Sequence, residues 1–505
     1  MTEFAVAAGH SVTVEAAAAV LREGGSAVDA AIAAAFAAMV AEPVLAGFYG
    51  GGFLMVREAE GQARLLDFFV QTPKRAVSES ERDFRAIQAE FGTTTQEFHI
   101  GAAAIATPGV PTGLAEAHAL FGRVPMRELA QPALAAARQG VTVTAYQAQL
   151  GRIVAAILEA SPEASTLFCH EGVPHSEGAT ARNPDLADVL ETYAIEGHRF
   201  AMEGEAAQSL LLLTCEGGHL RSADLRDYRP EWRTPLSVSR GEARVSINPP
   251  PSLGGALIAF GLALSERDPD PAALARCFEA TSRARIEAAL DADPAIGASR
   301  LLSPDLISRY RRDILGRAAA TRGTTHISVI DRDGMGAALT LSNGEGCGLI
   351  ADGTGIMPNN MLGEEDLLPD GFESWLPDQR LCSMMAPLVV DWPDGRFAML
   401  GSGGSNRIRT ALVQVLLGMV DRSASLSDAI EAPRLHVEGA EPAMVDFEDV
   451  GGDMMRELLK AAYPEARPWS DRSMFFGGVH GAMSCSRNGL SAAGDPRRAG
   501  VGLIG

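Results

Sequence analysis

Cysteine, aromatic residues and long hydrophobic runs are all scarce in this sequence. The six cysteines lie far apart and form no CxxC pair, which argues against a zinc ribbon and a disulfide framework. The first residues include an acid, Glu3, and lack both a basic segment and an apolar run of membrane-spanning length, so we expect a cytoplasmic, soluble protein. The formal charge of -21 repels phosphate backbones and anionic lipid surfaces. We therefore expect neither nucleic acid nor a membrane as a partner.

Small residues are what the sequence has in abundance. The alanine-rich segment 11–42 predicts two helices, separated by a Glu-Gly-Gly-Ser stretch in which Ser26 is the expected N-cap, and ended by Pro43. Three glycines then precede an apolar strand, 53–56, that pairs naturally with 63–69. Because alanine and glycine let backbones approach closely, a chain of 505 residues with 47% hydrophobic residues can form a large, tightly packed core.

The two halves of the chain differ in pattern. Residues 112–215 predict mostly helices, whereas strand patterns interrupted by Asp-Gly turns dominate after residue 324. Neither a repeat nor a clean domain boundary separates the two halves. Strands paired as hairpins, with helices elsewhere, predict an α/β protein of the α+β type, with layers of helix, sheet, sheet and helix.

The segment RGTTHISVIDRDG, residues 322–334, changes from a helical pattern to a strand at two adjacent threonines. A two-residue turn at Asp333-Gly334 would place Thr324 across from Asn343, beside the polar, glycine-rich stretch 342–348. A threonine hydroxyl needs a base, and a free α-amino group on the same residue, with a reference pKa of about 7.7–8.0, is one known solution. Cleavage before Thr324 would create that base. Taken alone, however, Gly-Thr-Thr is more often only the start of a strand.

A series of motifs runs along almost the whole chain. In order they are EAAAAVLREGGSAVDAAIAAAFAAMVAEP, GFYGGGFLMV, TPGVPTGL, PPPSLGGA, TTHISVIDRDG, TGIMPNNML, SMMAPLVV, APRLH and GDPRRAG. Together they closely resemble the γ-glutamyltranspeptidase family. This resemblance implies an N-terminal nucleophile hydrolase, which is a four-layer αββα sandwich made as a precursor that cuts itself before the first threonine of TTH. The implied products are a large subunit, residues 1–323, and a small subunit, residues 324–505, which stay together as one globular unit.

The resemblance also implies catalytic roles. Thr324 would carry the γ-glutamyl group as an ester, which water or an acceptor amine then releases. Ser342 matches a second family hydroxyl near the nucleophile. Gly403 and Gly404 match a glycine pair whose backbone N–H groups form the oxyanion hole, and each such donor contributes on the order of 3 kcal/mol in the transition state.

A substrate-binding set follows from the same resemblance: Asn343, Glu345, Asn360, Glu364, Cys382 and Ser383. Cys382 and Ser383 match a serine pair that contacts the substrate carboxylate, although a thiol is the weaker donor. Glu364 matches an acidic residue that binds the substrate amino group. A family asparagine matches Gly344, so its neighbours Asn343 and Glu345 are the candidate substitutes.

Two departures leave the substrate open. The family arginine that binds the glutamyl α-carboxylate matches Phe69, and a polar family position matches Met361, so the implied pocket is less polar. We therefore weigh three hypotheses: cleavage of γ-glutamyl amides such as glutathione, the same machinery acting on another acyl amide such as a glutaryl one, and an uncleaved, non-catalytic relative used for binding. We expect no cofactor and no metal, since the segment CHEGVPH, residues 169–175, matches no standard metal-site spacing.

Overall fold

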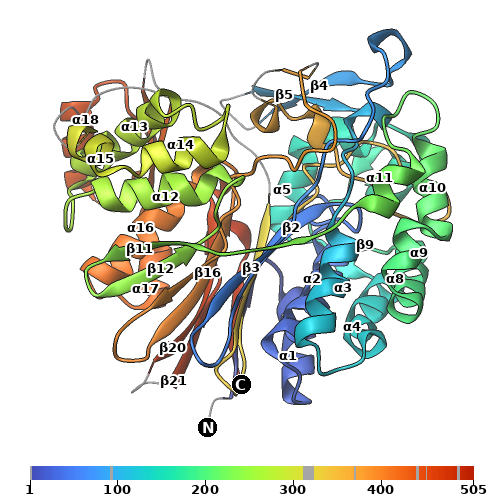
Figure 1. Ribbon diagram of the computed structural model, residues 1–505, viewed down its shortest axis with the longest axis horizontal. Helices are drawn as coiled ribbons and strands as arrows, with labels where there is room; N and C mark the ends of the chain where they lie inside the picture. The colour runs from blue at the N-terminus through green and yellow to red at the C-terminus, as the bar shows by residue number, and fades with distance from the viewer. Residues whose placement is uncertain are drawn as a thin grey trace.

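Two antiparallel β-sheets lie face to face at the centre of the molecule, and helices cover the outer face of each sheet (Figure 1). The computed structural model describes residues 3–90, 95–310, 324–368, 371–372, 374–439, 443–450, 452–485 and 489–505. Within these residues the layers follow the order helix, sheet, sheet, helix. The predicted four-layer αββα fold is therefore confirmed.

The first sheet has seven strands and carries the two threonines. In spatial order its strands are β10 (Glu231–Arg233), β3 (Ala63–Phe68), β2 (Gly51–Arg57), β14 (Gly336–Ser342), β13 (Thr325–Ile330), β1 (Ala5–Ala8) and β22 (Val501–Ile504). Every residue of β13 is buried, because one face of the strand packs on the helices and the other on the second sheet. The predicted pairing of β2 with β3 is confirmed.

The second sheet has six strands and packs against β13 and β14 through two of them, β16 and β20. In spatial order its strands are β11 (Leu236–Arg240), β12 (Ala243–Ile247), β15 (Leu388–Asp391), β16 (Phe397–Gly403), β20 (Gly478–Cys485) and β21 (Gly489–Ala493). The sheet-to-sheet interface therefore lies directly behind the strand that begins at Thr325.

The helical layer on the first sheet begins with the alanine-rich helices α1 (Ser11–Arg22) and α2 (Ala27–Ala41), and α3 (Val110–Phe121) packs on β3. α4 (Met126–Gln139) packs on α2, and α8 (Pro184–Glu196) packs on α4. Ser26 is the N-cap of α2 as expected, and it forms a capping box with Asp29. Almost all of α2 is buried, and it contacts both β13 and β14. Its small side chains allow that close approach to the sheet.

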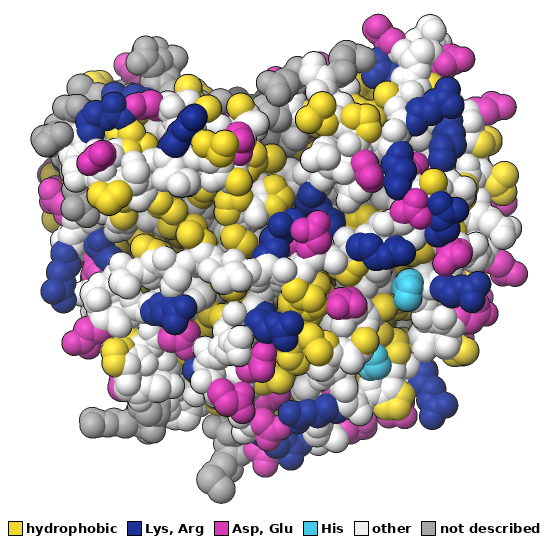
Figure 2. All heavy atoms as spheres, in the orientation of Figure 1, with side chains coloured by type: hydrophobic (Ala, Val, Ile, Leu, Met, Phe, Trp, Pro, Cys, Tyr) yellow, Lys and Arg dark blue, Asp and Glu magenta, His cyan; other side chains and the backbone are white. Residues whose placement is uncertain are grey.

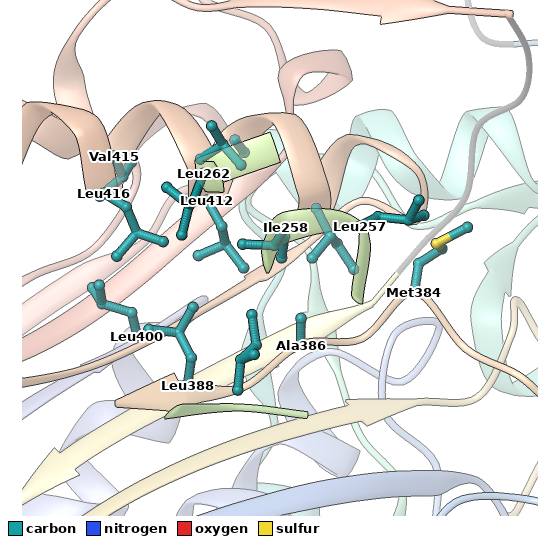
Figure 3. Close-up of a cluster of buried hydrophobic side chains, with 14 of the residues drawn as sticks. Leu257, Ile258, Leu262, Met384, Ala386, Leu388, Leu400, Leu412, Val415 and Leu416 are labelled. Atoms are coloured by element: carbon teal, nitrogen blue, oxygen red, sulfur yellow. The ribbon is translucent and has the colours of Figure 1, made fainter. Parts of the chain in front are cut away.

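The second helical layer is held by a mainly aliphatic core. Leu257, Ile258 and Leu262 of α12 (Leu253–Leu264) point toward Leu412, Val415 and Leu416 of α16 (Arg407–Asp421), above Leu388 and Leu400 of the sheet (Figure 3). Met384 lies at one end of this cluster, with Ala386 beside it (Figure 3). The core therefore extends to the segment just before β15. α13 (Pro271–Glu287) and α17 (Leu426–Glu431) complete the layer.

The remaining elements surround these layers. The helices are α5 (Ala145–Ile153), α6 (Ala155–Leu158), α7 (Pro162–Phe168), α9 (His198–Met202), α10 (Glu205–Leu213), α11 (Ser222–Asp227), α14 (Pro294–Leu301), α15 (Pro304–Tyr310) and α18 (Asp453–Ala462). Small sheets pair β4 (Arg85–Glu90) with β5 (Thr95–Ile100), β6 (Val141–Thr142) with β9 (Thr180–Ala181), β7 (Cys169–His170) with β8 (Val173–Pro174), and β18 (Met444–Glu448) with β17 (Leu435–Glu438) and β19 (Arg467–Trp469).

None of the described helices has both the length and the apolar character needed to cross a bilayer. Basic and acidic side chains are interspersed on the face shown in Figure 2.

Candidate active site

The hairpin of β13 and β14 places Thr324 across from Ser342. Thr325 pairs with Leu341, and the same register carried one residue further joins Thr324 to Ser342. The expected partner, Asn343, was wrong by one residue, because the turn has three residues between Asp331 and Met335 instead of two. The Asp331 carboxylate accepts hydrogen bonds from the amides of Asp333 and Met335, which closes this longer turn.

Thr324 lines a pocket whose walls come from segments far apart in the sequence. The described residues that line it are Phe69, Leu253, Thr324, Ser342, Met361, Glu364, Leu367, Ser383, Met384, Met385, Ser405 and Ile408. Of the predicted site residues, the pocket thus brings together Thr324, Ser342, Glu364 and Ser383, along with Phe69. Three of its walls come from α12, from α16 and from the segment before β15, so the aliphatic core of Figure 3 supports the pocket directly.

The backbone of Gly403 lies against the carbonyl of Thr324. A Cβ atom at Gly403 would lie 1.9 Å from the Thr324 oxygen, so only glycine fits there. Gly404 has φ +121°, which also favours glycine, and Ser405 continues the segment into the pocket wall. Gly403 therefore contacts Thr324, and Gly404 follows it in the chain; the oxyanion-hole role of the pair stays a prediction.

Two ionisable side chains that sequence reasoning missed contact Thr324 and Thr325. The Thr325 hydroxyl donates to the Glu42 carboxylate at 2.5 Å, and Thr13 donates to the other oxygen of that carboxylate at 3.3 Å. Burial raises the pKa of Glu42 to about 7, even though both hydrogen bonds lower it. Arg498 donates to the Thr324 carbonyl at 3.2 Å. Glu42 lies in the motif AEP and Arg498 in the motif GDPRRAG, but nothing in the sequence indicates that these two side chains contact Thr325 and Thr324.

The neighbouring histidine has a structural place. His326 is buried between the sheets, where its two ring nitrogens contact the hydroxyls of Thr340 and Ser328 at 2.8 and 2.9 Å. Burial lowers its pKa well below the usual value, so the ring is neutral. It therefore joins the two strands instead of facing the pocket.

The loop after Ser342 is organised by Asn360. The Asn360 amide oxygen accepts hydrogen bonds from the backbone N–H groups of Glu345 and Gly346 at 2.9 and 3.2 Å. A Cβ atom at Gly344 would lie 2.2 Å from this oxygen and 2.5 Å from an oxygen of Glu364. The side chains of Asn360 and Glu364 therefore fill the space that a larger residue at position 344 would need.

The rest of the predicted substrate-binding set lies outside the pocket lining. Asn343 donates to the Met357 carbonyl at 3.1 Å and packs against Gly47. Glu345 is buried in the loop that Asn360 organises, and it is absent from the described lining, as are Asn360 and Cys382. Burial raises the pKa of the Cys382 thiol to about 11, so that thiol is neutral. Among the described residues, no group of His, Cys, Asp and Glu side chains is arranged to hold a metal ion.

A threonine at a strand end, between two stacked sheets with outer helices, is the arrangement of the N-terminal nucleophile hydrolases. The family model described as gamma-glutamyltranspeptidase matches residues 13–504. The chain therefore belongs to the γ-glutamyltranspeptidase family, and it is an enzyme of the hydrolase and acyltransferase type.

Individual relatives and a solved structure agree with this family. The acylase ACY 1 proenzyme of Pseudomonas sp. strain V22 is 32% identical over 86% of this chain and 82% of its own length. The glutathione hydrolase proenzyme of Pseudomonas aeruginosa is 28% identical over 99% of this chain and 94% of its own length. The crystal structure of cephalosporin acylase from Bacillus halodurans superposes with a TM-score of 0.84 over 99% of this chain and 96% of the other, at 22% identity. That last likeness supports the fold.

Proposed function

We propose that this protein is a self-processing threonine hydrolase that cleaves γ-glutamyl amides, such as glutathione, through an ester on Thr324. The observation that carries the proposal is the place of Thr324, which precedes β13, lines the pocket with Ser342 and contacts the backbone of Gly403. Relatives described as glutathione hydrolase proenzymes, such as that of Pseudomonas aeruginosa, support both the substrate and the precursor form.

Maturation would begin with an attack by the Thr324 hydroxyl on the carbonyl carbon of Gly323, a residue outside the described part of the chain. The peptide C–N bond breaks, the acyl group moves to the hydroxyl oxygen, and the α-amino group of Thr324 is freed. Water then hydrolyses the ester. The products are the large subunit, ending in a carboxylate at residue 323, and the small subunit, beginning with Thr324.

In the mature enzyme the α-amine of Thr324 takes the hydroxyl proton while the oxygen attacks the substrate amide. The N–H groups of Gly403 and Gly404 stabilise the oxyanion, and the leaving amine takes the proton as the C–N bond breaks. Ser342 lies beside the reacting hydroxyl, and Glu364 and Ser383 contact the acyl group. Water or an acceptor amine then releases that group from Thr324.

A second candidate is the same chemistry on a different acyl amide. Phe69 lies in the pocket wall and stacks on Phe53 with ring centroids 5.4 Å apart, so an aromatic face occupies the place expected of a carboxylate-binding arginine. Relatives described as acylase proenzymes favour the same view. A glutaryl amide differs from a γ-glutamyl amide only in lacking the amino group. Comparing the two anilides separates these candidates.

The intact mass of the purified protein tests self-processing directly. We expect the wild type to give two chains that meet at Gly323/Thr324 and a Thr324→Ala variant to give one chain of 53.0 kDa. The wild type should release nitroaniline from γ-glutamyl-4-nitroanilide and the variant should not. A wild type that stays uncut after long incubation would overturn the proposal and favour a non-catalytic binding role. The cytoplasmic location stays a prediction, which activity assays on fractionated cells would test.

A further inference from the structure

A second pocket has Glu42 in its lining and is separate from the acyl pocket, which Thr324 lines. Its walls come from the last turn of α2, the turn at residues 42–45, β6 and α5, together with segments that include Phe168. No described residue lines both pockets. Val44 and Phe168 are half-buried, so part of the lining faces solvent. A ligand can therefore enter this pocket while the acyl pocket is occupied.

The lining of the second pocket is apolar, and its polar side chains already have partners in the protein. Only three of its described residues are polar, namely Glu42, Gln147 and His175. Gln147 donates to the Ala41 carbonyl, and a ring nitrogen of His175 contacts the Leu167 carbonyl at 3.2 Å. An aliphatic chain would gain apolar contacts here, whereas a charged group would lose its hydration.

The charge of Glu42 is already balanced within the protein. Burial raises the pKa of Glu42 to about 7, and the hydroxyls of Thr325 and Thr13 and the positive charge of Arg498 act against this rise. Glu42 is only 3% exposed, so an ammonium group would have to give up its own hydration to compete with these contacts. The second pocket therefore favours a neutral ligand over a charged one.

The second pocket is also connected to Thr324 by apolar packing. Leu45 and Leu150 belong to its lining and to a small hydrophobic cluster against which Ala499 packs. Ala499 directly follows Arg498, which donates to the Thr324 carbonyl. A ligand in contact with these two leucines is thus linked to both threonines, through Arg498 and through Glu42.

We infer that the second pocket binds a neutral aliphatic molecule that acts as an effector of the Thr324 reaction. The aliphatic chain replaces solvent beside Glu42 and so favours the protonated form of its carboxyl group. A neutral carboxyl group accepts a weaker hydrogen bond from Thr325 than a carboxylate does, so the start of β13 is held less firmly. The effector therefore lowers turnover without entering the acyl pocket. Its binding is independent of the proposed function, whereas its effect on turnover rests on that function.

Binding is measured in the Thr324→Ala variant, which keeps the full chain and needs no activity. Hexanenitrile is the probe, because it carries neither a charge nor an amine or hydroxyl that could accept an acyl group. Hexanoate and hexylammonium present the same chain with a negative and a positive head group. Ligand-observed NMR titrations give the dissociation constants. We expect hexanenitrile to bind at least about tenfold more tightly than either ion.

The location of the bound probe is tested by Gly151→Leu. A Cβ atom at Gly151 would lie 3.4 Å from Pro174 and 3.8 Å from Leu158, which both line the pocket, so a leucine side chain would fill it without a backbone clash. This variant should weaken hexanenitrile binding by about tenfold or more. Gln149→Leu is the matched control, because it places the same side chain at an exposed position of α5, and it should bind like its parent. Intact mass of both variants with Thr324 restored shows whether they fold and process.

The pH dependence of binding tests the role of Glu42. Because the ligand favours protonated Glu42, its dissociation constant should rise by roughly threefold to tenfold between about pH 6 and about pH 8.5. Among the groups near Glu42, arginine 498 is charged throughout this range, and burial raises the pKa of Tyr146 and lowers that of His10, so both stay neutral. Glu42→Gln should remove the pH dependence, and His175→Gln should keep it.

The effect on turnover is measured with γ-glutamyl-4-nitroanilide and the processed enzyme. Saturating hexanenitrile should lower kcat by at least about twofold, and excess substrate should not relieve the inhibition. Gly151→Leu should abolish this response, and Gln149→Leu should retain it.

The outcomes separate this inference from the proposed function. Absence of hexanenitrile binding, or binding that Gly151→Leu leaves unchanged, would overturn the pocket assignment and keep the proposed function. Tighter binding of hexanoate or hexylammonium would overturn the neutral ligand class. Binding that leaves kcat unchanged, or inhibition that substrate relieves, would overturn the effector role. A processed enzyme that is inactive on the anilide would count against the proposed function, while the binding measurements would still decide the pocket.

Discussion

Replacing Thr325 by valine should destabilise the protein more at alkaline than at acidic pH. Valine keeps the shape of threonine but removes the hydroxyl that donates to Glu42 at 2.5 Å. The carboxylate is fully buried, and it loses the shorter of its two threonine hydrogen bonds. The size of the effect depends on whether Glu42 is ionised, and this gives the prediction its pH dependence.

The sign follows from the pKa of Glu42, which is about 7 in the folded protein against 4.5 for the model group. Because the folded value is raised, Glu42 favours folding when protonated, and this contribution is lost as pH rises through about 4.5 to 7. Above pH 7 the buried carboxylate costs roughly 3 kcal/mol, which the Thr325 hydroxyl partly offsets. A hydrogen bond to a charged group contributes about 1.5–3 kcal/mol and one to a neutral group about 1 kcal/mol. Thr325→Val should therefore cost roughly 1–2 kcal/mol more at high pH than at low pH.

Thermal unfolding at about pH 5 and about pH 8.5 measures how much stability Thr325→Val loses relative to its parent at each pH. Both proteins carry Thr324→Ala, so that each is a single chain. Glu42→Gln supplies the control, because the valine substitution in that background should cost the same at both pH values. Thr13→Val, at the longer 3.3 Å contact, should show the same trend more weakly. An equal cost at both pH values with Glu42 present would refute the argument.

Three further substitutions probe the backbone of the site and the buried charges beside it. Gly403→Ala should abolish processing and activity, because its Cβ would lie 1.9 Å from the Thr324 oxygen. Gly261→Ala is the control, since the Cβ there would lie 3.5 Å from its nearest atom. Intact mass should show that the control variant is processed normally. Arg498→Met should lower kcat more than it raises KM in steady-state kinetics, because it frees the Thr324 carbonyl while Arg498 is not itself among the described residues that line the pocket. Arg434→Met removes one of the two cations that pair with the buried Asp495 carboxylate, while Arg497 stays in contact with it. The substitution should cost about 1.5–3 kcal/mol in denaturant unfolding, with the preference between γ-glutamyl and glutaryl anilides unchanged.

Local rules predicted much of this fold because the relevant signals lie within a few residues of one another. The N-cap at Ser26 and its capping box with Asp29 need only four consecutive residues, and the pairing of β2 with β3 needs one turn. The turn after β13 was misjudged because the rule for Asp-Gly turns ignores Asp331, whose side chain closes a longer loop. That one-residue error placed Asn343 across from Thr324, where Ser342 belongs.

The site itself was predictable only in part. Thr324 and the glycine segment are marked by contiguous motifs, and the structure places Gly403 against the Thr324 carbonyl, while their catalytic roles stay predictions. Glu42 reaches Thr325 across 283 residues of sequence, and Arg498 reaches Thr324 across 174. Contacts of that kind come from the stacking of layers, which no local pattern specifies. The resemblance also assigned Asn360 to the substrate, and this stays a prediction; in the structure its amide oxygen accepts from the backbone of the neighbouring loop.

In the proposed mechanism, catalysis and specificity depend on different parts of this molecule. Thr324 is fixed through backbone groups, since its carbonyl contacts Arg498 on one side and the Gly403 backbone on the other. Side-chain changes in the pocket leave those contacts intact. The acyl group, in contrast, meets side chains from separate segments, among them Phe69 after β3 and Met384 before β15. Substitutions such as arginine to phenylalanine can therefore change the accepted acyl group while the nucleophile keeps its geometry. This separation accounts for one family whose members are described both as glutathione hydrolases and as acylases.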